Sequence, residues 1–125
     1  MRNLLYVLLG GAVGSGCRYG LALLINEWLN HPRFPAGTFL INLLGSFAIG
    51  LLAELFRLQV LLAPELRLAL ITGVLGGFTT FSAYSLENLS LLREGANWLA
   101  ASYALGSVAG GLLCAWAGMR LAQVI

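Results

Sequence analysis

Charged side chains are scarce in this chain of 125 residues, and two kinds of them are missing. There is no lysine and no aspartate, so seven arginines and five glutamates supply a charged share of 10%, against roughly 25% in soluble domains. This shortage excludes an ordinary soluble domain. The net charge of +2 is too small and too scattered to indicate a nucleic-acid-binding surface. With 59% hydrophobic residues and a mean hydropathy of +0.87, the chain is predicted to lie in a membrane.

Cysteine and histidine are also rare, which bears on metal sites and catalysis. The two cysteines, Cys17 and Cys114, sit in apolar segments, and neither has a metal-ligand spacing to the other or to the one histidine, His31. We interpret them as small residues of the membrane interior. Since His31 belongs to a predicted connection, and Glu54 and Glu87 to different predicted helices, no pairing of a nucleophile with a base can be argued. The sequence therefore predicts that the protein is not an enzyme.

The chain contains long segments without charged residues. Crossing the hydrocarbon core takes about 20 apolar residues. Three charge-free windows meet or approach this length, and a fourth is interrupted only by Arg18: 34–53, 68–86, 95–119 and 3–25. We therefore predict an all-α membrane protein, one domain over 1–125, with four transmembrane helices at roughly 3–26, 36–57, 67–91 and 95–121. The connections carry turn signals: NHPRFP at 30–35, APE at 63–65 and REGAN at 93–97.

Small residues recur at four-residue spacing on these helices. They form four sets: Gly10 and Gly14, Gly16 and Gly20, Ser46 and Gly50, and Ser102 with Gly106 and Gly110. In lipid, such faces let helix backbones approach closely. Because a single four-helix chain encloses little volume, so many packing faces indicate partners, most simply further copies of the chain.

The arginines give almost no preferred orientation in the membrane. Four spans put the N-terminus, the middle connection and the C-terminus on one side, and that side holds Arg2, Arg57, Arg67 and Arg120. The other side holds Arg33 and Arg93, with Arg18 nearer to it. This balance is nearly neutral under the positive-inside rule, so we expect that the chain can insert both ways round.

The stretch TGVLGGFTTFSAYSLE, at 72–87, is the most specific signal. Gly76 and Gly77 each cost a helix about 1 kcal/mol, and alternating rings and hydroxyls follow them. Unwound backbone at membrane depth is tolerated only inside protein or beside a cavity, where its carbonyls can bind a cation and the next helix N-terminus favours an anion. Phe81 and Tyr84 share a face, and their electropositive ring edges could stabilise a bare anion. A glycine kink with ordinary aromatic packing is the alternative, but it explains the hydroxyls poorly.

Two further helices carry polar residues inside their spans, where such residues are costly and usually functional. Asn42 shares one helical face with Thr38 and Ser46. Its amide either makes an interhelical packing hydrogen bond or lines a pathway as a donor, and the sequence leaves both open. The last helix carries a narrow stripe at four-residue spacing: Tyr103, Ser107 and Gly111. By itself, this stripe favours packing over a pore.

Three motifs together resemble a known family. They are GCRYG at 16–20, GTFLINLLGSF at 37–47 and GGFTTFSAYSLE at 76–87, and in order and spacing they are similar to the signature of the Fluc (CrcB) fluoride channels. The likeness covers essentially the whole chain. It implies a passive fluoride-selective channel of a bacterial-type plasma (inner) membrane. It also implies an antiparallel, dual-topology homodimer with two pores, a third helix broken in mid-membrane and a buried central sodium ion.

The resemblance also implies roles for individual residues. The sodium ion would be held by the backbone carbonyls of Gly76 and Thr79. The fluoride pore would comprise Asn42, Phe81, Tyr84, Tyr103 and Ser107, with Thr38, Thr80, Ser82 and Ser85 as nearby hydroxyls. Arg18, at the vestibule, and Glu87 match further polar positions. Two residues depart from the family pattern: Tyr84 stands where phenylalanine is expected, and Gly111 stands where some members have serine.

Two other functions remain as alternatives. A small multidrug-type, proton-coupled exporter is also a four-helix protein, but it needs a membrane-embedded carboxylate, and the first helix here has no acid before Glu27. Proton dependence of flux would distinguish it from a channel. A structural or assembly protein of the bilayer would use its polar residues only for packing, and it would carry no ion flux.

Overall fold

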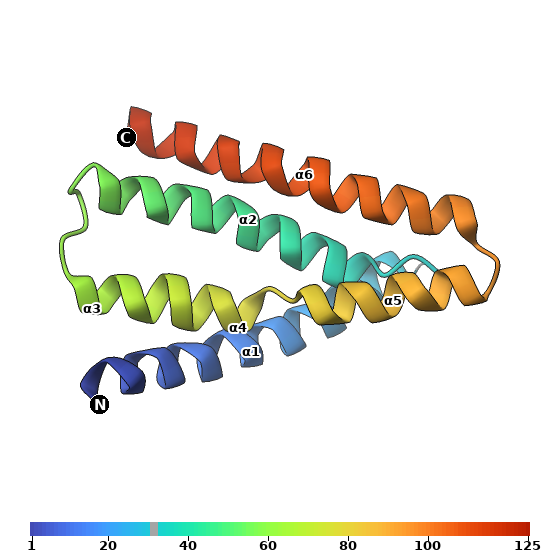
Figure 1. The fold of residues 1–125 in the computed structure, drawn as a ribbon, viewed down its shortest axis with the longest axis horizontal. Coiled ribbons are helices and arrows are strands. Elements are labelled where there is room, and N and C mark those ends of the chain that lie inside the picture. Colours follow the sequence, from blue (N-terminus) through green and yellow to red (C-terminus); the bar gives the residue numbers. More distant parts are fainter. Residues whose placement is uncertain (31–32) are drawn as a thin grey trace.

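The computed structural model describes residues 1–30 and 33–125, in which every regular element is a helix (Figure 1). The elements are α1 (Arg2–Leu29), α2 (Ala36–Arg57), α3 (Pro64–Arg67), the π-helical η1 (Leu68–Leu75), α4 (Gly76–Phe78), α5 (Phe81–Arg93) and α6 (Asn97–Val124). Part of the predicted connection at 30–35, including His31, lies outside the described residues. Four segments are long and apolar enough to cross a membrane: Arg2–Leu29, Ala36–Arg57, Pro64–Arg93 and Asn97–Val124.

The helix ends follow from local backbone chemistry. α1 continues past its predicted end at 26 and stops at Asn30, whose φ of 36° and ψ of 40° are left-handed, a conformation that asparagine tolerates. α2 has its predicted bounds, and the Asn26 side chain accepts a hydrogen bond from the Gly37 N–H in its first turn. The third span begins three residues before its predicted start, because Pro64 occupies the first helical position, where its missing N–H costs nothing.

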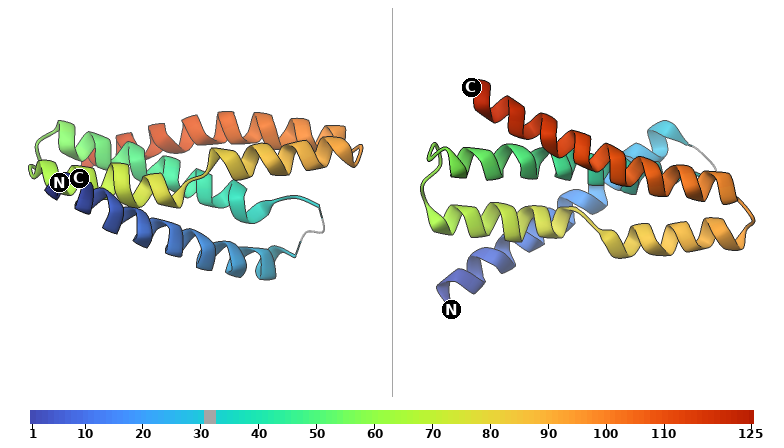
Figure 2. Two further views of the ribbon diagram at one scale, coloured as in Figure 1. Left: turned by 60° about the horizontal axis from the view of Figure 1, so that its bottom comes forward. Right: turned by 45° about the horizontal axis from the view of Figure 1, so that its top comes forward.

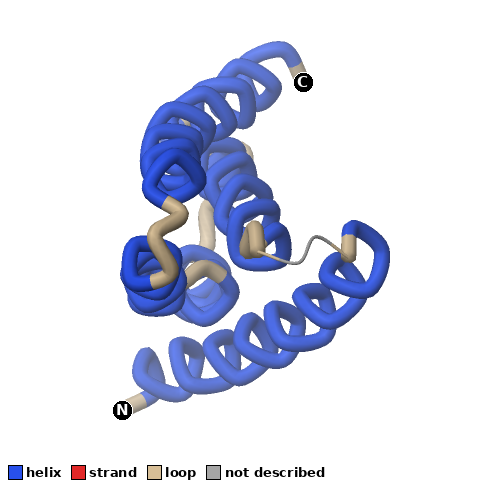
Figure 3. Tube along the Cα trace, turned by 90° about the vertical axis from the view of Figure 1, so that its right-hand side faces the viewer, coloured by secondary structure: helices blue, strands red, loops and turns tan. Residues whose placement is uncertain are grey.

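The spans pack as two pairs. α2 and α6 lie side by side and run in the same direction, while α1 crosses the third span at an angle (Figures 1 and 2). Seen along the bundle, α1, which starts at the end marked N, runs obliquely past the other spans (Figure 3). Both chain termini and the α2–α3 connection lie at one end of the bundle, as four spans require (Figure 1).

Most of the small-residue faces are used inside the chain. A Cβ on Gly14 would overlap the Val74 carbonyl, and one on Gly50 would overlap the Ala115 carbonyl. Gly106 and Gly110 similarly face side chains of α2. In the described part of the chain, Gly16 and Gly20 have no atom within 4 Å of an added Cβ. Most of these faces therefore close contacts between helices of one chain, and the expectation of further copies rests on the Gly16 and Gly20 face.

Two buried polar centres join the helices at opposite ends. Near the C-terminal ends of α2 and α6, the Glu54 carboxylate is 4% exposed and accepts hydrogen bonds from Arg57 and from Gln123 Nε2, the latter at 2.8 Å. Near the α5–α6 turn, fully buried Tyr103 packs with Leu91, and its hydroxyl donates to Glu87 Oε2 at 2.8 Å. Most other large apolar side chains point outward, as expected of helices surrounded by lipid.

Candidate functional site

The third span leaves helical geometry at two threonines. α4 ends at Phe78, Thr79 (φ −86°, ψ 157°) and Thr80 (φ −151°, ψ 117°) are extended, and α5 begins at Phe81. Threonine suits extended backbone and offers a hydroxyl to nearby main-chain groups. Accordingly, Thr79 Oγ1 donates to the Leu75 carbonyl at 3.0 Å, and Thr80 Oγ1 caps α5 by accepting from the Ala83 N–H at 3.2 Å.

The glycine pair before these threonines has a different role from the predicted one. Gly76 is helical, with φ −62° and ψ −37°, and Gly77 also belongs to α4. A Cβ on Gly77 would lie 2.5 Å from the Gly11 carbonyl oxygen, so this glycine permits close contact with α1. The disruption attributed to the glycines thus belongs to the two threonines after them.

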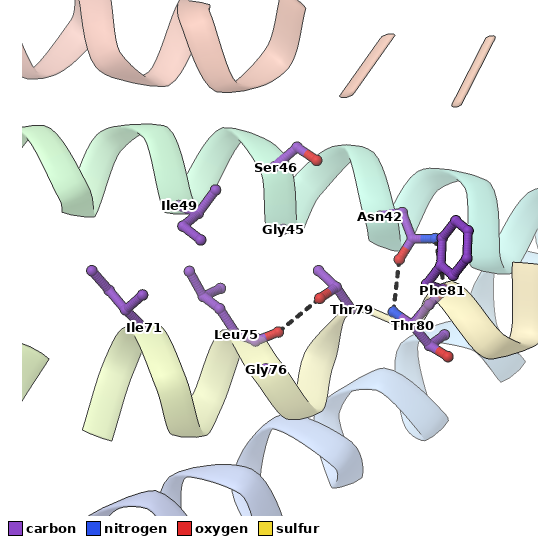
Figure 4. Close-up of a pocket in the computed structure, with 10 residues that line it drawn as sticks. All are labelled: Asn42, Gly45, Ser46, Ile49, Ile71, Leu75, Gly76, Thr79, Thr80 and Phe81. Atoms are coloured by element: carbon purple, nitrogen blue, oxygen red, sulfur yellow. Dashed lines mark hydrogen bonds between the residues drawn. The ribbon is translucent and has the colours of Figure 1, made fainter. Parts of the chain in front are cut away.

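Asn42 holds the extended segment from the neighbouring helix. Its Nδ2 donates to the Thr80 carbonyl at 3.1 Å, and its Oδ1 accepts from the Thr80 N–H at 2.9 Å (Figure 4). The amide thereby satisfies both main-chain groups of a residue that has left the helix. Of the two interpretations left open, the interhelical hydrogen bond is present, and one of the two Nδ2 protons remains for another acceptor.

We call this pair of hydrogen bonds between Asn42 and Thr80 the clamp. The clamp also changes the hydrogen bonding of the carbonyls in α4. In an uninterrupted helix the Thr80 N–H would donate to the Gly76 carbonyl. Here it donates to Asn42, which deprives the Gly76 carbonyl of its helical donor. The next carbonyl, of Gly77, accepts from Arg18 Nε at 3.1 Å. In the two described ranges, no three His, Cys, Asp or Glu side chains form a group that could hold a metal ion.

A cavity of about 350 Å³ lies along this segment, and we call it the clamp cavity (Figure 4). Its lining comprises Asn42, Gly45, Ser46, Ile49, Ile71, Leu75, Gly76, Thr79, Thr80 and Phe81. The Phe81 side chain is 79% exposed and lies beside Asn42. The cavity therefore combines an amide donor, hydroxyls and an aromatic ring in an otherwise apolar lining.

A second cavity, of about 300 Å³, is called here the arginine cavity. It is lined by Arg18, Tyr19, Ala22, Asn26, Thr38, Ile41, Thr80, Ala83 and Glu87. Within it the Glu87 carboxylate accepts from Thr38 Oγ1 at 2.6 Å, and its other oxygen accepts from the Tyr103 hydroxyl at 2.8 Å. Thr80 is the one described residue that lines both cavities, so it lies between the clamp cavity and the arginine cavity.

The remaining predicted pore residues are distributed around these cavities. The Tyr84 ring meets the Tyr103 ring edge-on, with centroids 5.0 Å apart, and lies 5.5 Å from the Phe81 ring. Ser82 Oγ is 3.2 Å from Thr80 Oγ1, whereas Ser85 Oγ donates to the Phe81 carbonyl of its own helix. The structure thus gathers most of the predicted residues around Thr80, and it leaves the Ser85 hydroxyl engaged elsewhere.

Two polar residues around the site were not predicted. Asn88 Nδ2 donates to the Tyr84 hydroxyl at 3.3 Å, and Asn88 Oδ1 is buried without a partner in the described part of the chain. The four-residue spacing from Tyr84 to Asn88 is a signal that could have identified this pair. Asn26, which lines the arginine cavity, has no such signal, because its partner Gly37 follows a connection.

Comparisons with known proteins identify relatives of this chain. A family model described as CrcB-like protein, Camphor Resistance (CrcB), matches residues 5–119. A protein of Methylobacillus flagellatus is 43% identical, covering 99% of this chain and 97% of the relative. Relatives from Chloroflexus aurantiacus (46%; 98% and 97% covered) and Chlorobaculum tepidum (47%; 99% and 97% covered) are similar to the same extent.

All three relatives carry the name fluoride-specific ion channel FluC. They are named as channels and not as enzymes, in agreement with the sequence, and they lend no support to the exporter alternative. Together with the four apolar spans, they identify a multi-pass membrane protein. The chain therefore belongs to the CrcB-like family, the family of the fluoride-specific ion channels.

Proposed function

We propose that this chain forms a passive, fluoride-selective channel in a bacterial-type plasma membrane. The observation that carries the proposal is the clamp: an Asn42 amide with one N–H still free, beside the exposed ring of Phe81, on a cavity inside a membrane protein. Fluoride is small, strongly hydrated and a strong hydrogen-bond acceptor, so it loses its water only where donors replace it. The names of the relatives point to the same ion.

Selectivity would follow from the kinds of group that line the path. The free Asn42 N–H and the Thr80 hydroxyl are compact donors, and the edge of Phe81 is electropositive. Arg18, in the arginine cavity, adds a positive charge on the far side of Thr80. Thr38 and Tyr103 already donate to Glu87, so we assign them to positioning that carboxylate, and their contact with the ion would require Glu87 to release them.

We further propose that two copies assemble antiparallel, with two pores and a sodium ion between them. The near balance of arginines between the two ends of the bundle supports the antiparallel arrangement. Three observations support the ion site. The extended threonines lie close to the middle of the third span, as a break in mid-membrane requires. The Gly76 carbonyl has lost its helical donor, and Gly76 borders open space. With Thr79 it could offer main-chain oxygens, the ligands a hard monovalent cation needs. A dimer structure in high sodium without density between the paired threonine segments would rule out this ion site.

Fluoride efflux tests the channel proposal directly. Purified protein in liposomes loaded with potassium fluoride, with valinomycin added to carry potassium, should release fluoride to an external electrode. Efflux should not depend on a proton gradient, whereas an exporter would require one. Liposomes that retain fluoride and every other small anion would leave only a structural role.

Replacing Phe81 with isoleucine should lower fluoride efflux about tenfold, because a ring edge is worth about 0.5–1.5 kcal/mol and isoleucine keeps the bulk without the ring. The control is Tyr84→Phe, which keeps a ring at the neighbouring position and removes only the hydroxyl that Asn88 contacts. We expect this control to retain efflux. Phe81→Ile liposomes that release fluoride at the parent rate would exclude Phe81 from the path.

Both insertion directions should be present in one membrane. A single cysteine at either terminus, in a variant lacking Cys17 and Cys114, should react with an impermeant maleimide added from either side. The reason is the near balance of arginines between the two ends of the bundle. Reaction from one side alone would exclude dual topology while leaving fluoride conduction untouched.

A further inference from the structure

Polar residues of α2 and α6 face one another in register. The two helices run parallel, and Gly106, Gly110 and Gly118 meet Phe39, Leu43 and Phe47 in the same order along both. Four-residue steps from Asn42 on α2 and from Ser107 on α6 lead to Ser46 and Gly111. These last two are in contact, since a Cβ on Gly111 would lie 3.4 Å from Ser46 Oγ.

The Ser46 hydroxyl makes no hydrogen bond to a carbonyl of its own helix. Elsewhere in the chain, Ser85, Ser90 and Ser102 each donate to the carbonyl four residues earlier, as serines in membrane helices commonly do. Ser46 makes no such bond, nor any other to a described residue. Ser107 Oγ is buried and likewise has no partner in residues 1–30 and 33–125.

The position of Ser46 connects this free hydroxyl to the clamp. Ser46 lines the clamp cavity together with Asn42, and Figure 4 shows it one turn further along α2. On the α6 side, Gly111 contributes no side chain, and a Cβ there would lie 3.4 Å from Ser46 Oγ, so the serine hydroxyl is the polar group at this contact. A small acceptor that leaves Asn42 would meet Ser46 as the next donor on α2.

We propose that Ser46 is a further contact for the permeating anion, and that it supplies from α2 the hydroxyl that α6 lacks at Gly111. This inference rests on the proposed fluoride conduction. It extends the path from the clamp toward the ends of α2 and α6 that hold Glu54. Ser107 on α6 and Ser46 on α2 would then be successive donors to the anion. Neither hydroxyl donates to a carbonyl of its own helix.

The test moves the hydroxyl from one helix to the other. Ser46→Ala should lower fluoride efflux from liposomes about tenfold, because a hydrogen bond to a charged group is worth a factor of at least that order. The double variant Ser46→Ala/Gly111→Ser should recover most of the efflux, since a side chain at 111 has room and points at the vacated place. Ser102→Ala is the matched control, because its hydroxyl is bound to the Trp98 carbonyl, and it should conduct like the parent.

Each outcome separates this inference from the channel proposal. Loss in Ser46→Ala with recovery in the double variant supports the inference, provided that Ser46→Ala/Gly111→Ala, which adds a Cβ at the same place without a hydroxyl, does not recover. Parent-like efflux of Ser46→Ala overturns it and leaves fluoride conduction standing. Loss without recovery also overturns it, provided that both variants elute as the parent does in size-exclusion chromatography. A parent protein that releases no fluoride defeats the channel proposal itself.

Discussion

Fluoride efflux is expected to fall about a hundredfold or more when Asn42 is replaced with aspartate, because the change removes two favourable contacts and adds a repulsion. The carboxylate cannot donate to the Thr80 carbonyl, which Asn42 Nδ2 contacts at 3.1 Å. One carboxylate oxygen would instead face that carbonyl oxygen. The remaining donor toward the clamp cavity is lost as well, and its place is taken by a negative charge in the path of an anion.

The measurement is efflux from liposomes with equal amounts of parent and variant protein. Asn97→Asp provides a matched control, since it makes the same chemical change at the exposed start of α6, where a helix N-terminus favours a negative charge. It should conduct like the parent. If Asn42→Asp liposomes released fluoride within a factor of three of the parent, neither the clamp nor the free amide proton would be needed for conduction.

The second large effect concerns stability and arises where α1 crosses the third span. Gly14→Ala places a Cβ against the Val74 carbonyl, with its carbon at 2.8 Å and the Phe78 nitrogen at 3.0 Å. These are main-chain atoms, so no side-chain rotation relieves the overlap. We expect a loss of about 3 kcal/mol in the free energy of unfolding, at the upper end of the usual cost of overpacking.

Gly11→Ala makes the same change one turn earlier on α1, where the nearest atom to the added Cβ, the Gly73 oxygen, is 4.0 Å away. This control should unfold like the parent or slightly later, because alanine favours a helix. Both variants can be compared by denaturant titration in detergent. Equal midpoints for the two would show that α1 can move away from the third span without cost, contrary to the close packing described above.

The sequence predicted the spans well, because scarcity of charge is a property of each segment by itself. The sequence did not predict the backbone conformation where it depends on contacts with a neighbouring helix. Gly76 and Gly77 favour a break by propensity, yet both stay helical, and Gly77 serves the contact with α1, which no local pattern reveals. By sequence alone, Thr79 and Thr80 are compatible with helical or extended backbone. The hydrogen bonds of Asn42 to Thr80 stabilise the extended form.

The sequence indicated which residues belong to the candidate site, but it did not indicate their hydrogen-bond partners. The resemblance of three motifs named most of the residues around Thr80. It did not indicate that Thr38 and Tyr103 both donate to Glu87, because these partners are 49 and 16 residues apart in sequence. Ser46 was assigned to a helical face by periodicity alone. Its unbonded hydroxyl, its place in the lining of the clamp cavity and its position opposite Gly111 distinguish it from a packing serine.

The clamp has a consequence for protein engineering. Among the described residues, Asn42 forms hydrogen bonds only with main-chain atoms of Thr80, so the clamp itself does not require a particular side chain at position 80. That side chain must still cap α5, a task that serine, aspartate and asparagine share with threonine. Because it lines both cavities, position 80 can be varied in charge and in hydrogen-bonding capacity on an unchanged scaffold. On the proposed channel function, a library of these four residues at position 80 should therefore alter ion preference while the fold is kept.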